Sequence, residues 1–464
     1  EISLGLVGSE MCIRDRVKKK KVDRQEENIM KKKILSLLLV AGLSVSLFAG
    51  CGSGAADADK ATAEGGKEAA SDLKIGAILI GDETETYSKA HIDGIKEAAK
   101  ELGIPENNIE WKERIDESED CYDAAKALVA DGCTLVISNS YGHQDYIAEA
   151  AEEFTDVNFV SMTGDYAAIS GLDNYYNAFT NVYESRYVSG VVAGMKIAEL
   201  DKNGEIPKDG YDEDGNVKVG YVGAYPYAEV VSGYTAFFLG IQSVFPNVVM
   251  DVQYTNSWFD IDGEAAAADM LIKRGCVIIG QHADSTGAPD TVEKAWQNGQ
   301  VVYSVGYNMS MLDVAPDAAL TSATNVWSAY YKELFSDVLN GKEIPQDWSK
   351  GFNDDAVAIT DLGPNVAEGT ADKVAEVEAA LKDGSLHVFD TSKFTVNGKQ
   401  ITEDDAKVDL SYVDYSTNTV VYKGDTKTAL VTDDDGNSYF EESVLRAAPY
   451  FTLRIDGITE LNAN

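Results

Sequence analysis

Basic residues are scarce in this chain of 464 residues. Lysine and arginine together number 39 against 78 aspartates and glutamates, so the formal net charge is −39. Nucleic-acid binding depends on neutralising phosphates with basic side chains, and a negative surplus on this scale repels the phosphate backbone. The composition therefore excludes nucleic acid as a partner and is typical of a solvated protein facing the medium.

Cysteines are also few. The chain has five, and only Cys121, Cys133 and Cys276 lie in the part that we expect to fold. An odd number does not favour a disulfide framework, and Cys133 and Cys276 each begin an apolar run. The pattern predicts buried free thiols.

The apolar run at residues 34–48 is too short to span a bilayer comfortably, which takes about 20 residues. Met30 and three lysines precede it, and Ala49-Gly50-Cys51 follows it. A charged segment, an apolar segment and a small-residue cleavage site together predict a signal peptide over residues 30–50. Residues 1–29 lie upstream of Met30 and are interpreted as non-native sequence.

The end of this segment, Leu47-Phe48-Ala49-Gly50-Cys51, resembles a bacterial lipobox, with Phe48 where leucine is usual. The resemblance implies that Cys51 is lipidated and anchors an extracytoplasmic protein to the bacterial cell membrane. The alternative is a non-lipidated signal peptide with an incidental Cys51. Residues 51–72 follow without an aromatic residue and are predicted to be a disordered tether.

Strands and helices alternate from residue 73 onward. Leu73–Ile80 is an apolar run suited to a buried strand, and Tyr87–Leu102 has helical spacing; the pair is then repeated to residue 162. A second series runs from Tyr183–Leu200, where Gly190 and Gly194 predict close helix packing, to Val305. Alternation of this kind predicts an α/β fold with parallel sheets and helices on both faces.

The two series predict two lobes. The first lobe comprises residues 73–182 with about 306–330, and the second comprises residues 183–305 with about 331–390. Residues 391–464 are predicted to form an irregular, strand-rich C-terminal extension, with a hairpin at Asn397-Gly398 and short strands that include Tyr450–Ile455.

One pattern occurs in both series. Leu128–Asn139 and the run that begins at Leu271 share the order leucine, apolar, two residues, Gly-Cys, then an apolar strand that turns polar. The repeat implies two similar halves, each with a polar strand end.

The strand ends show which ligands the fold suits, because ligands of parallel α/β sheets lie beyond the carboxyl ends of the strands. Lysine and arginine are missing from these ends, whereas a phosphorylated ligand wants basic groups or a glycine-rich cradle. A neutral, flat, hydrogen-bonding ligand fits better. The candidate binding residues are Tyr87, Ser140, Tyr141, Asp145, Glu229, Trp258, Asp260, His282, Asp284 and Asn308.

Trp258 is the main candidate for stacking on a planar ligand, and Asp260 is placed to accept hydrogen bonds from it. The alternative is that Trp258 is a core residue and Asp260 caps the helix that begins near Ile261. Phe259 is predicted to be a core residue.

His282, Asp284 and Ser285 carry the residue types of a hydrolase triad. Three residues on one strand-to-helix turn do not usually converge as nucleophile, base and orienting group, so catalysis is disfavoured. Ligand contact or helix capping is expected instead. His282 and Asp284 lack the further histidines or cysteines of a metal site, so no metal or cofactor is predicted.

These segments together resemble the basic membrane protein family, the substrate-binding lipoproteins of ABC transporters that capture purine nucleosides or nucleobases. The resemblance covers about residues 73–390 and rests on the order and spacing of several short motifs: Ser140–Asp145, Tyr187–Gly190, Val219–Gly223, Ser257–Asp260 and Leu320–Ser322. It implies a type I periplasmic-binding-protein fold, in which two doubly wound lobes close on a hinge over the purine.

The resemblance also implies roles for individual residues. Tyr87 and Trp258 would stack on the two faces of the base, and Asp145 would bond its edge. Glu229 and the segment Gln281–Thr286 match a branch associated with nucleobases. Asn308 and Asn325 stand where nucleoside binders have aspartate and lysine, which favours a bare base over a nucleoside.

The sequence thus predicts a non-enzymatic solute-binding lipoprotein that delivers a purine base or nucleoside to an ABC permease. Two alternatives stay open: a sugar-binding protein of the same fold, and a secreted nucleoside hydrolase that uses His282 and Ser285.

Overall fold

The computed structural model describes residues 70–463 apart from 415–418 and 434–435. The predictions for residues 1–29, the signal peptide, the lipid anchor Cys51 and nearly all of the tether lie outside the described residues. Among the described helices, none has the length and apolar character needed to cross a membrane.

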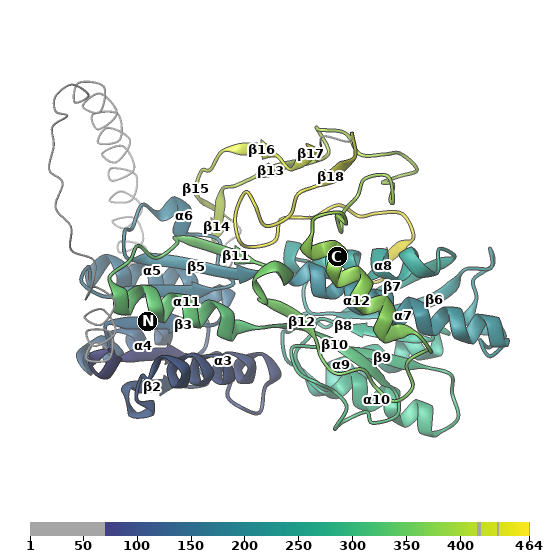
Figure 1. The fold of residues 1–464 in the computed structure, drawn as a ribbon, viewed down its shortest axis with the longest axis horizontal. Helices are drawn as coiled ribbons and strands as arrows, with labels where there is room; N and C mark the ends of the chain where they lie inside the picture. Colours follow the sequence, from purple (N-terminus) through teal and green to yellow (C-terminus); the bar gives the residue numbers. More distant parts are fainter. Residues whose placement is uncertain (1–69, 415–418, 434–435, 464) are drawn as a thin grey trace, which may run out of the picture.

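The first lobe is built on a six-stranded parallel sheet (Figure 1). Its central strands are apolar and fully buried, as expected for strands covered by helices on both faces. Helices α3 (Thr86–Leu102) and α11 (Trp327–Asn340) share one core with the sheet, and α4 (Glu119–Ala130) and α5 (Gln144–Glu153) share the core on the other side. The strands, in spatial order, are β11 (Asp347–Lys350), β5 (Tyr175–Thr180), β4 (Asn158–Met162), β3 (Leu135–Ser138), β1 (Ile75–Ile78) and β2 (Ile109–Lys112).

The second lobe repeats this plan with seven strands. Their spatial order is β12 (Val357–Ile359), β10 (Ala319–Asn325), β9 (Tyr303–Tyr307), β8 (Ile278–Gln281), β6 (Val217–Gly223), β7 (Val248–Tyr254) and β19 (Ile458–Glu460). Its helices are α7 (Val182–Asn203), α8 (Ala228–Val244), α9 (Ile261–Lys273), α10 (Gly287–Gln297) and α12 (Thr370–Lys382). Strands β3 and β8 hold the same place in the two sheets, which confirms the two similar halves inferred from the repeat.

Helices α7 and α8 pack closely through glycine. A Cβ atom on Gly190 would lie 2.1 Å from the carbonyl oxygen of Phe237, and one on Gly240 would lie 2.1 Å from that of Tyr187. The prediction of close packing at Gly190 is therefore confirmed, and Gly240 is its counterpart on the facing helix.

The chain returns between the lobes at other points than the sequence analysis predicted. Residues 306–330 were assigned to the first lobe, but β10 pairs with β9 in the second sheet. Residues 331–390 were assigned to the second lobe, but most of α11 and all of β11 belong to the first. The apolar patterns of these segments predict burial without showing which of two similar sheets provides the partner strand.

The C-terminal segment, residues 391–463, contacts both lobes. The described part forms short two-stranded sheets, and β19 adds to the edge of the second-lobe sheet. Phe440 and Phe451 pack with Phe389 in the second-lobe core, whereas Tyr412 stacks on Tyr166 of the first lobe at 4.5 Å. The segment therefore joins the lobes on one side (Figure 1).

Two local predictions for this segment had different outcomes. The hairpin at Asn397-Gly398 is confirmed, because both residues have positive φ and Val396 pairs with Lys399. The strand predicted at Tyr450–Ile455 was wrong: these residues form no strand, because Phe451 and Tyr450 are held by side-chain packing and by the Glu442 carboxylate.

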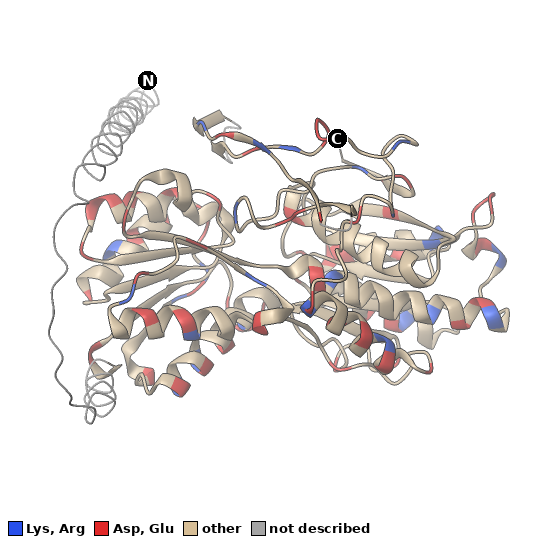
Figure 2. Cartoon of the chain, turned by 45° about the horizontal axis from the view of Figure 1, so that its top comes forward, with Lys and Arg blue, Asp and Glu red and all other residues tan. Residues whose placement is uncertain are grey.

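The charge and cysteine predictions agree with the structure. Acidic side chains are spread over both lobes (Figure 2). Cys121, Cys133 and Cys276 are buried free thiols.

Candidate ligand-binding cleft

A cleft of about 330 Å³ lies between the lobes at the carboxyl ends of their strands. Its lining comes from the ends of β1, β2, β3 and β4 and the start of α3 in the first lobe, and from the start of α8 and the ends of β7, β8 and β9 in the second. This is where a doubly wound fold places its ligand, and the volume suits a small molecule.

Aromatic rings line the cleft from both lobes. Tyr87, in the first turn of α3, faces it from the first lobe, and Trp258, after β7, faces it from the second. Trp258 is half-buried and its ring lies edge-on to Tyr225, with centroids 5.1 Å apart. Phe259 also lines the cleft and is 40% exposed, so its prediction as a core residue was wrong. It follows a strand end and is not covered by a neighbouring element.

The first-lobe wall is held by backbone and side-chain hydrogen bonds. The buried Glu85 caps α3 by accepting from the backbone N–H groups of Tyr87 (2.7 Å) and Ser88 (2.8 Å). Asn139, at the end of β3, accepts from the N–H of Ile80 at 2.9 Å, and its carbonyl oxygen accepts from the Tyr87 hydroxyl. These bonds fix the position of Tyr87 in the wall.

Asp82 and Arg114 form an ion pair at the first-lobe side of the cleft. Hydrogen bonds from Thr84 and Arg114 lower the pKa of Asp82 to about 2, so this carboxylate stays charged at neutral pH. Its charge is already balanced by Arg114.

A chain of amides lies behind the second-lobe wall and supports its carboxyl group Asp284. Asn308 donates to Asp284 at 2.8 Å and accepts from Asn325 at 3.1 Å, and Asn325 accepts from the Thr180 hydroxyl at 2.5 Å. Burial raises the pKa of Asp284 well above its usual range, and nearby Glu85 adds to the effect. Thr180 and Asn325 end β5 and β10, directly before the chain crosses between the lobes, so the chain of bonds links the cleft to the hinge.

One hydrogen bond crosses the cleft itself. The Thr86 hydroxyl of the first lobe donates to the carbonyl oxygen of Asp284 in the second at 2.6 Å. The lobes therefore touch at the site, as in a closed arrangement.

His282 and Glu229 form a pair on the second-lobe wall. The Nε2 atom of His282 lies 3.1 Å from a Glu229 carboxylate oxygen. Burial lowers the pKa of His282 to about 4, with the nearby Arg186 as the second cause, and Glu229 offsets only part of this. A neutral imidazole that donates from Nε2 is the state consistent with this pairing near neutral pH.

Arg186, on α7, is buried behind this pair. It lies 3.6 Å from the centroid of the Tyr307 ring and donates to the carbonyl oxygen of Gln281. It provides positive charge beneath a cleft wall rich in carboxyl groups.

A second buried carboxyl group, Glu264 of α9, supports the loop after β8. It accepts from the backbone N–H of Ser285 at 3.1 Å. Burial raises the pKa of Glu264 to about 7. The Ser285 hydroxyl accepts from the N–H of Gly287 at 3.1 Å and has no hydrogen bond to His282, so these two described residues do not form the pair that a hydrolase needs.

The structure brings most of the predicted binding residues together. Ser140 and Tyr141 line the cleft, but their hydroxyls are directed to Glu117 (2.6 Å) and Asp165 (3.4 Å). Asn308 reaches the site only through Asp284. The predicted residues in the lining are Tyr87, Ser140, Tyr141, Glu229, Trp258, His282 and Asp284.

Asp145 and Asp260 lie outside the lining. Asp145 is in the first turn of α5. Burial raises the pKa of Tyr175 and Tyr412, and the charge of Asp145 adds to the effect. Asp260 caps α9 by accepting from the N–H of Gly263 at 2.9 Å, the role weighed against ligand contact in the sequence analysis. Its carboxylate is occupied by its own helix.

Residues 79–386 match the family described as ABC transporter substrate-binding protein, PnrA-like. The chain belongs to this family. Substrate-binding proteins of ABC transporters hold small molecules and work with membrane permeases, which is the use that a cleft between two hinged lobes suits.

The names of two relatives of this substrate-binding protein refer to different ligands. It is 32% identical over 326 residues to a purine-binding protein of Brucella abortus, covering 70% of this chain and 85% of that protein. It is 29% identical over 260 residues to a putative ABC transporter glucose-binding protein of Haloferax volcanii, covering 56% and 60%.

Solved structures share the fold of this substrate-binding protein. An ABC transporter solute-binding protein from Aeropyrum pernix K1 aligns with a TM-score of 0.56 at 15% identity, over 68% of this chain and 93% of that one. A transcriptional activator of the comK gene from Bacillus halodurans aligns with a TM-score of 0.54 at 18% identity, over 68% and 99%.

Sequence reasoning missed several residues of the cleft. Glu85, Arg114, Asn139 and Thr163 line it, and none was among the candidates. Asn139 and Thr163 directly follow strands β3 and β4, so the strand-end rule would have found them if it had been applied to every strand. Arg114 lies on a loop whose path the sequence pattern does not determine.

Proposed function

We propose that this substrate-binding protein captures a purine nucleobase or nucleoside outside the cytoplasm and delivers it to an ABC permease. The observation that carries the proposal is the pair of aromatic rings, Tyr87 and Trp258, that line one cleft from opposite lobes. Two rings on opposite walls suit a flat ligand, because each stacks on one face when the lobes close. The similarity to a purine-binding protein supports the same ligand class.

The polar groups of the cleft suit the edge of a purine. Glu229 and Asp284 offer carboxyl oxygens, and His282 lies between Glu229 and the Tyr307 ring. Purines carry both N–H donors and ring-nitrogen acceptors, and a carboxyl group with a raised pKa, such as Asp284, can be an acceptor or a donor. Binding requires no covalent step and no cofactor.

Membrane attachment through a lipid on Cys51 is part of the proposal. It rests on the lipobox-like end of the predicted signal peptide. Mass spectrometry of the N-terminal peptide from a membrane fraction of a bacterium that expresses the natural gene tests it, since a diacylglycerol-modified Cys51 is expected and an unmodified cysteine contradicts it.

A ligand panel tests the purine proposal. Adenine, guanine, hypoxanthine and their nucleosides are each added to the purified chain, and the melting temperature and heat of binding are measured. A purine is expected to raise the melting temperature, because a ligand that binds only the folded state stabilises it by mass action. A rise with glucose or ribose and none with any purine would assign the cleft to a sugar, and the Haloferax volcanii relative is named for glucose.

A further inference from the structure

A second cavity, of about 450 Å³, adjoins the ligand-binding cleft. Tyr141, Thr163, Glu229 and Trp258 line both spaces. The far wall of the second cavity is made by the C-terminal segment, through Val413, Arg446, Ala448 and Pro449. These four residues lie beyond residue 386, where the match to the family ends.

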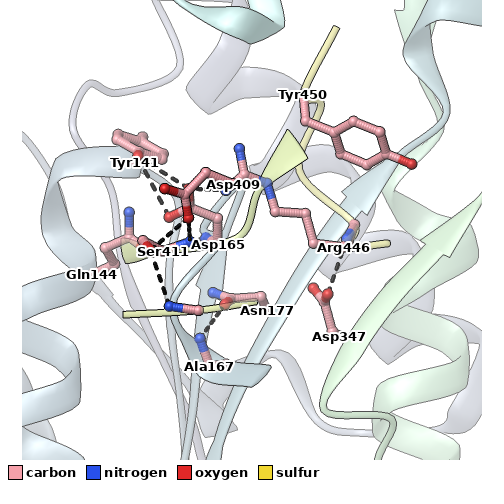
Figure 3. A network of polar contacts seen from close by, with 12 residues as sticks. Tyr141, Gln144, Asp165, Ala167, Asn177, Asp347, Asp409, Ser411, Arg446 and Tyr450 are labelled. Carbon is pink, nitrogen blue, oxygen red and sulfur yellow. Dashed lines mark hydrogen bonds and ion pairs between the residues drawn. The ribbon is translucent and has the colours of Figure 1, made fainter. Parts of the chain in front are cut away.

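The second cavity contains an acceptor and a donor side by side. Nη1 of Arg446 lies 3.1 Å from a carboxylate oxygen of Asp165, and the Tyr141 hydroxyl approaches the same carboxylate at 3.4 Å. Figure 3 shows Arg446 extending from the C-terminal segment toward Asp165 of the first lobe. The two side chains are 17% and 9% exposed, and both line the cavity, so part of each pair member faces that space.

A carboxylate beside a guanidinium suits neighbouring hydroxyl groups. Each hydroxyl both donates and accepts, so it can donate to Asp165 and accept from Arg446. The aromatic surface is also present, because Trp258 and Tyr227 line the cavity with ring centroids 6.2 Å apart. Aromatic faces pack against the apolar C–H face of a sugar while the carboxylate and guanidinium bind its hydroxyls.

The amides of Asn308 and Asn325 are not presented to such hydroxyls in the first cleft. The amides of Asn308 and Asn325 are bonded to Asp284, to Thr180 and to each other. Neither residue lines the cleft. The second cavity therefore adds a carboxylate and a guanidinium to the polar groups that the first cleft offers.

We infer that the C-terminal segment builds a second binding subsite, which holds a polyhydroxylated substituent such as a sugar attached to the base. The inference rests on the proposed binding of purines in the first cleft. It replaces the expectation of a bare base with that of a nucleoside, and it makes Asp165 and Arg446 the residues that distinguish the two.

Calorimetry with three ligands tests the inference: adenine, 9-methyladenine and adenosine. 9-Methyladenine carries a substituent at the same nitrogen without hydroxyls, so it separates hydrogen bonding from simple occupancy. In Asp165→Asn and Arg446→Met the affinity for adenosine is expected to fall about tenfold, the loss expected when a charged hydrogen bond is removed. The ratio of adenosine to 9-methyladenine affinity is therefore expected to fall by the same factor.

Arg454→Met is the matched control. Arg454 also lies in the C-terminal segment and also forms an ion pair of 3.1 Å, with Glu460, but it lines neither cavity. Its loss is expected to leave the ratio of adenosine to 9-methyladenine affinity unchanged. Val413→Trp is a second probe that leaves the ion pair intact and fills the cavity from its far wall; it is expected to weaken adenosine more than adenine.

The outcomes separate this inference from the proposed function. If the unchanged protein binds none of the three ligands, the same series is measured with the base that the ligand panel identifies, and if no purine of that panel binds, the purine proposal fails and the inference falls with it. If adenine binds but the Asp165 and Arg446 variants weaken all three ligands equally, or none of them, the ion pair only joins the C-terminal segment to the first lobe and the subsite is refuted.

Discussion

Replacement of Trp258 by alanine is the sharpest test of the cleft. The ring is half-buried, lines both cavities and is supported edge-on by Tyr225. Stacking of a base on an aromatic side chain contributes about 1–3 kcal/mol by alanine substitution. The Trp258→Ala variant is therefore expected to bind a purine between about fivefold and 150-fold more weakly.

Calorimetry with adenine measures the loss, and Trp258→Phe is expected to recover part of it because a smaller ring still stacks. Trp111→Ala is the matched control. Trp111 is also half-buried, but it lies on the edge strand β2 and lines neither cavity. An unchanged affinity in a folded Trp258→Ala variant would refute the stacking role of Trp258 and remove the main support for a purine ligand.

Three further predictions concern the hydrogen bond across the cleft, the buried Glu264 that supports the loop after β8, and the packing of α7 against α8. Thr86→Val removes the hydrogen bond that crosses the cleft, so it is expected to weaken ligand binding by about 0.5–1.5 kcal/mol and to increase the radius of gyration in X-ray scattering; Thr291→Val, which loses only a bond within α10, is expected to do neither. Glu264 has a pKa of about 7 in the folded state against 4.5 for an ordinary glutamate, so the folded state retains a proton that the unfolded chain loses, and the free energy of unfolding is expected to fall as the pH rises from 4.5 to 7. Glu264→Gln is expected to reduce this dependence of the unfolding free energy on pH, as measured by urea titration at several pH values. An equal dependence in both proteins would contradict the raised pKa of Glu264. Gly190→Ala is expected to destabilise the fold by about 1–3 kcal/mol, because the added methyl group meets the Phe237 carbonyl. The loss is expected to exceed that of Gly194→Ala, where the nearest atom is 2.8 Å from the added Cβ. Equal melting temperatures of the two variants would show that α7 shifts to make room for the methyl group.

The fold could be predicted from the sequence to a large extent because its signals are local. Apolar strands alternating with amphipathic helices indicate a doubly wound sheet, and the Gly-Cys repeat indicates that the sheet occurs twice. The return segments could not be assigned in the same way. Strand β10 and helix α11 are adjacent in the chain but belong to different lobes, and two similar lobes offer similar apolar partners.

The site was predictable where a side chain lies at or shortly after a strand end, as with Trp258 after β7 and His282 after β8. It was not predictable where a carboxylate has a local use. Asp260 and Glu229 are both carboxylates. Asp260 accepts from the Gly263 N–H of its own helix, whereas Glu229 pairs with His282 on the second-lobe wall of the cleft. The second cavity was invisible from the sequence, because Asp165 and Arg446 are far apart in the chain.

The position of β19 affects how the second lobe is completed. It pairs in parallel with β7, and Glu460 accepts from Tyr234 at 2.9 Å, a contact between residues 226 positions apart. Contacts over such a separation form late, because loop closure costs entropy before the contact stabilises anything. Until residues 458–460 arrive, β7 is an open edge strand that can pair with another chain. The stretch that matches the family, residues 79–386, therefore lacks the strand that covers β7, and expression of residues 70–390 alone is expected to leave β7 as an exposed edge strand.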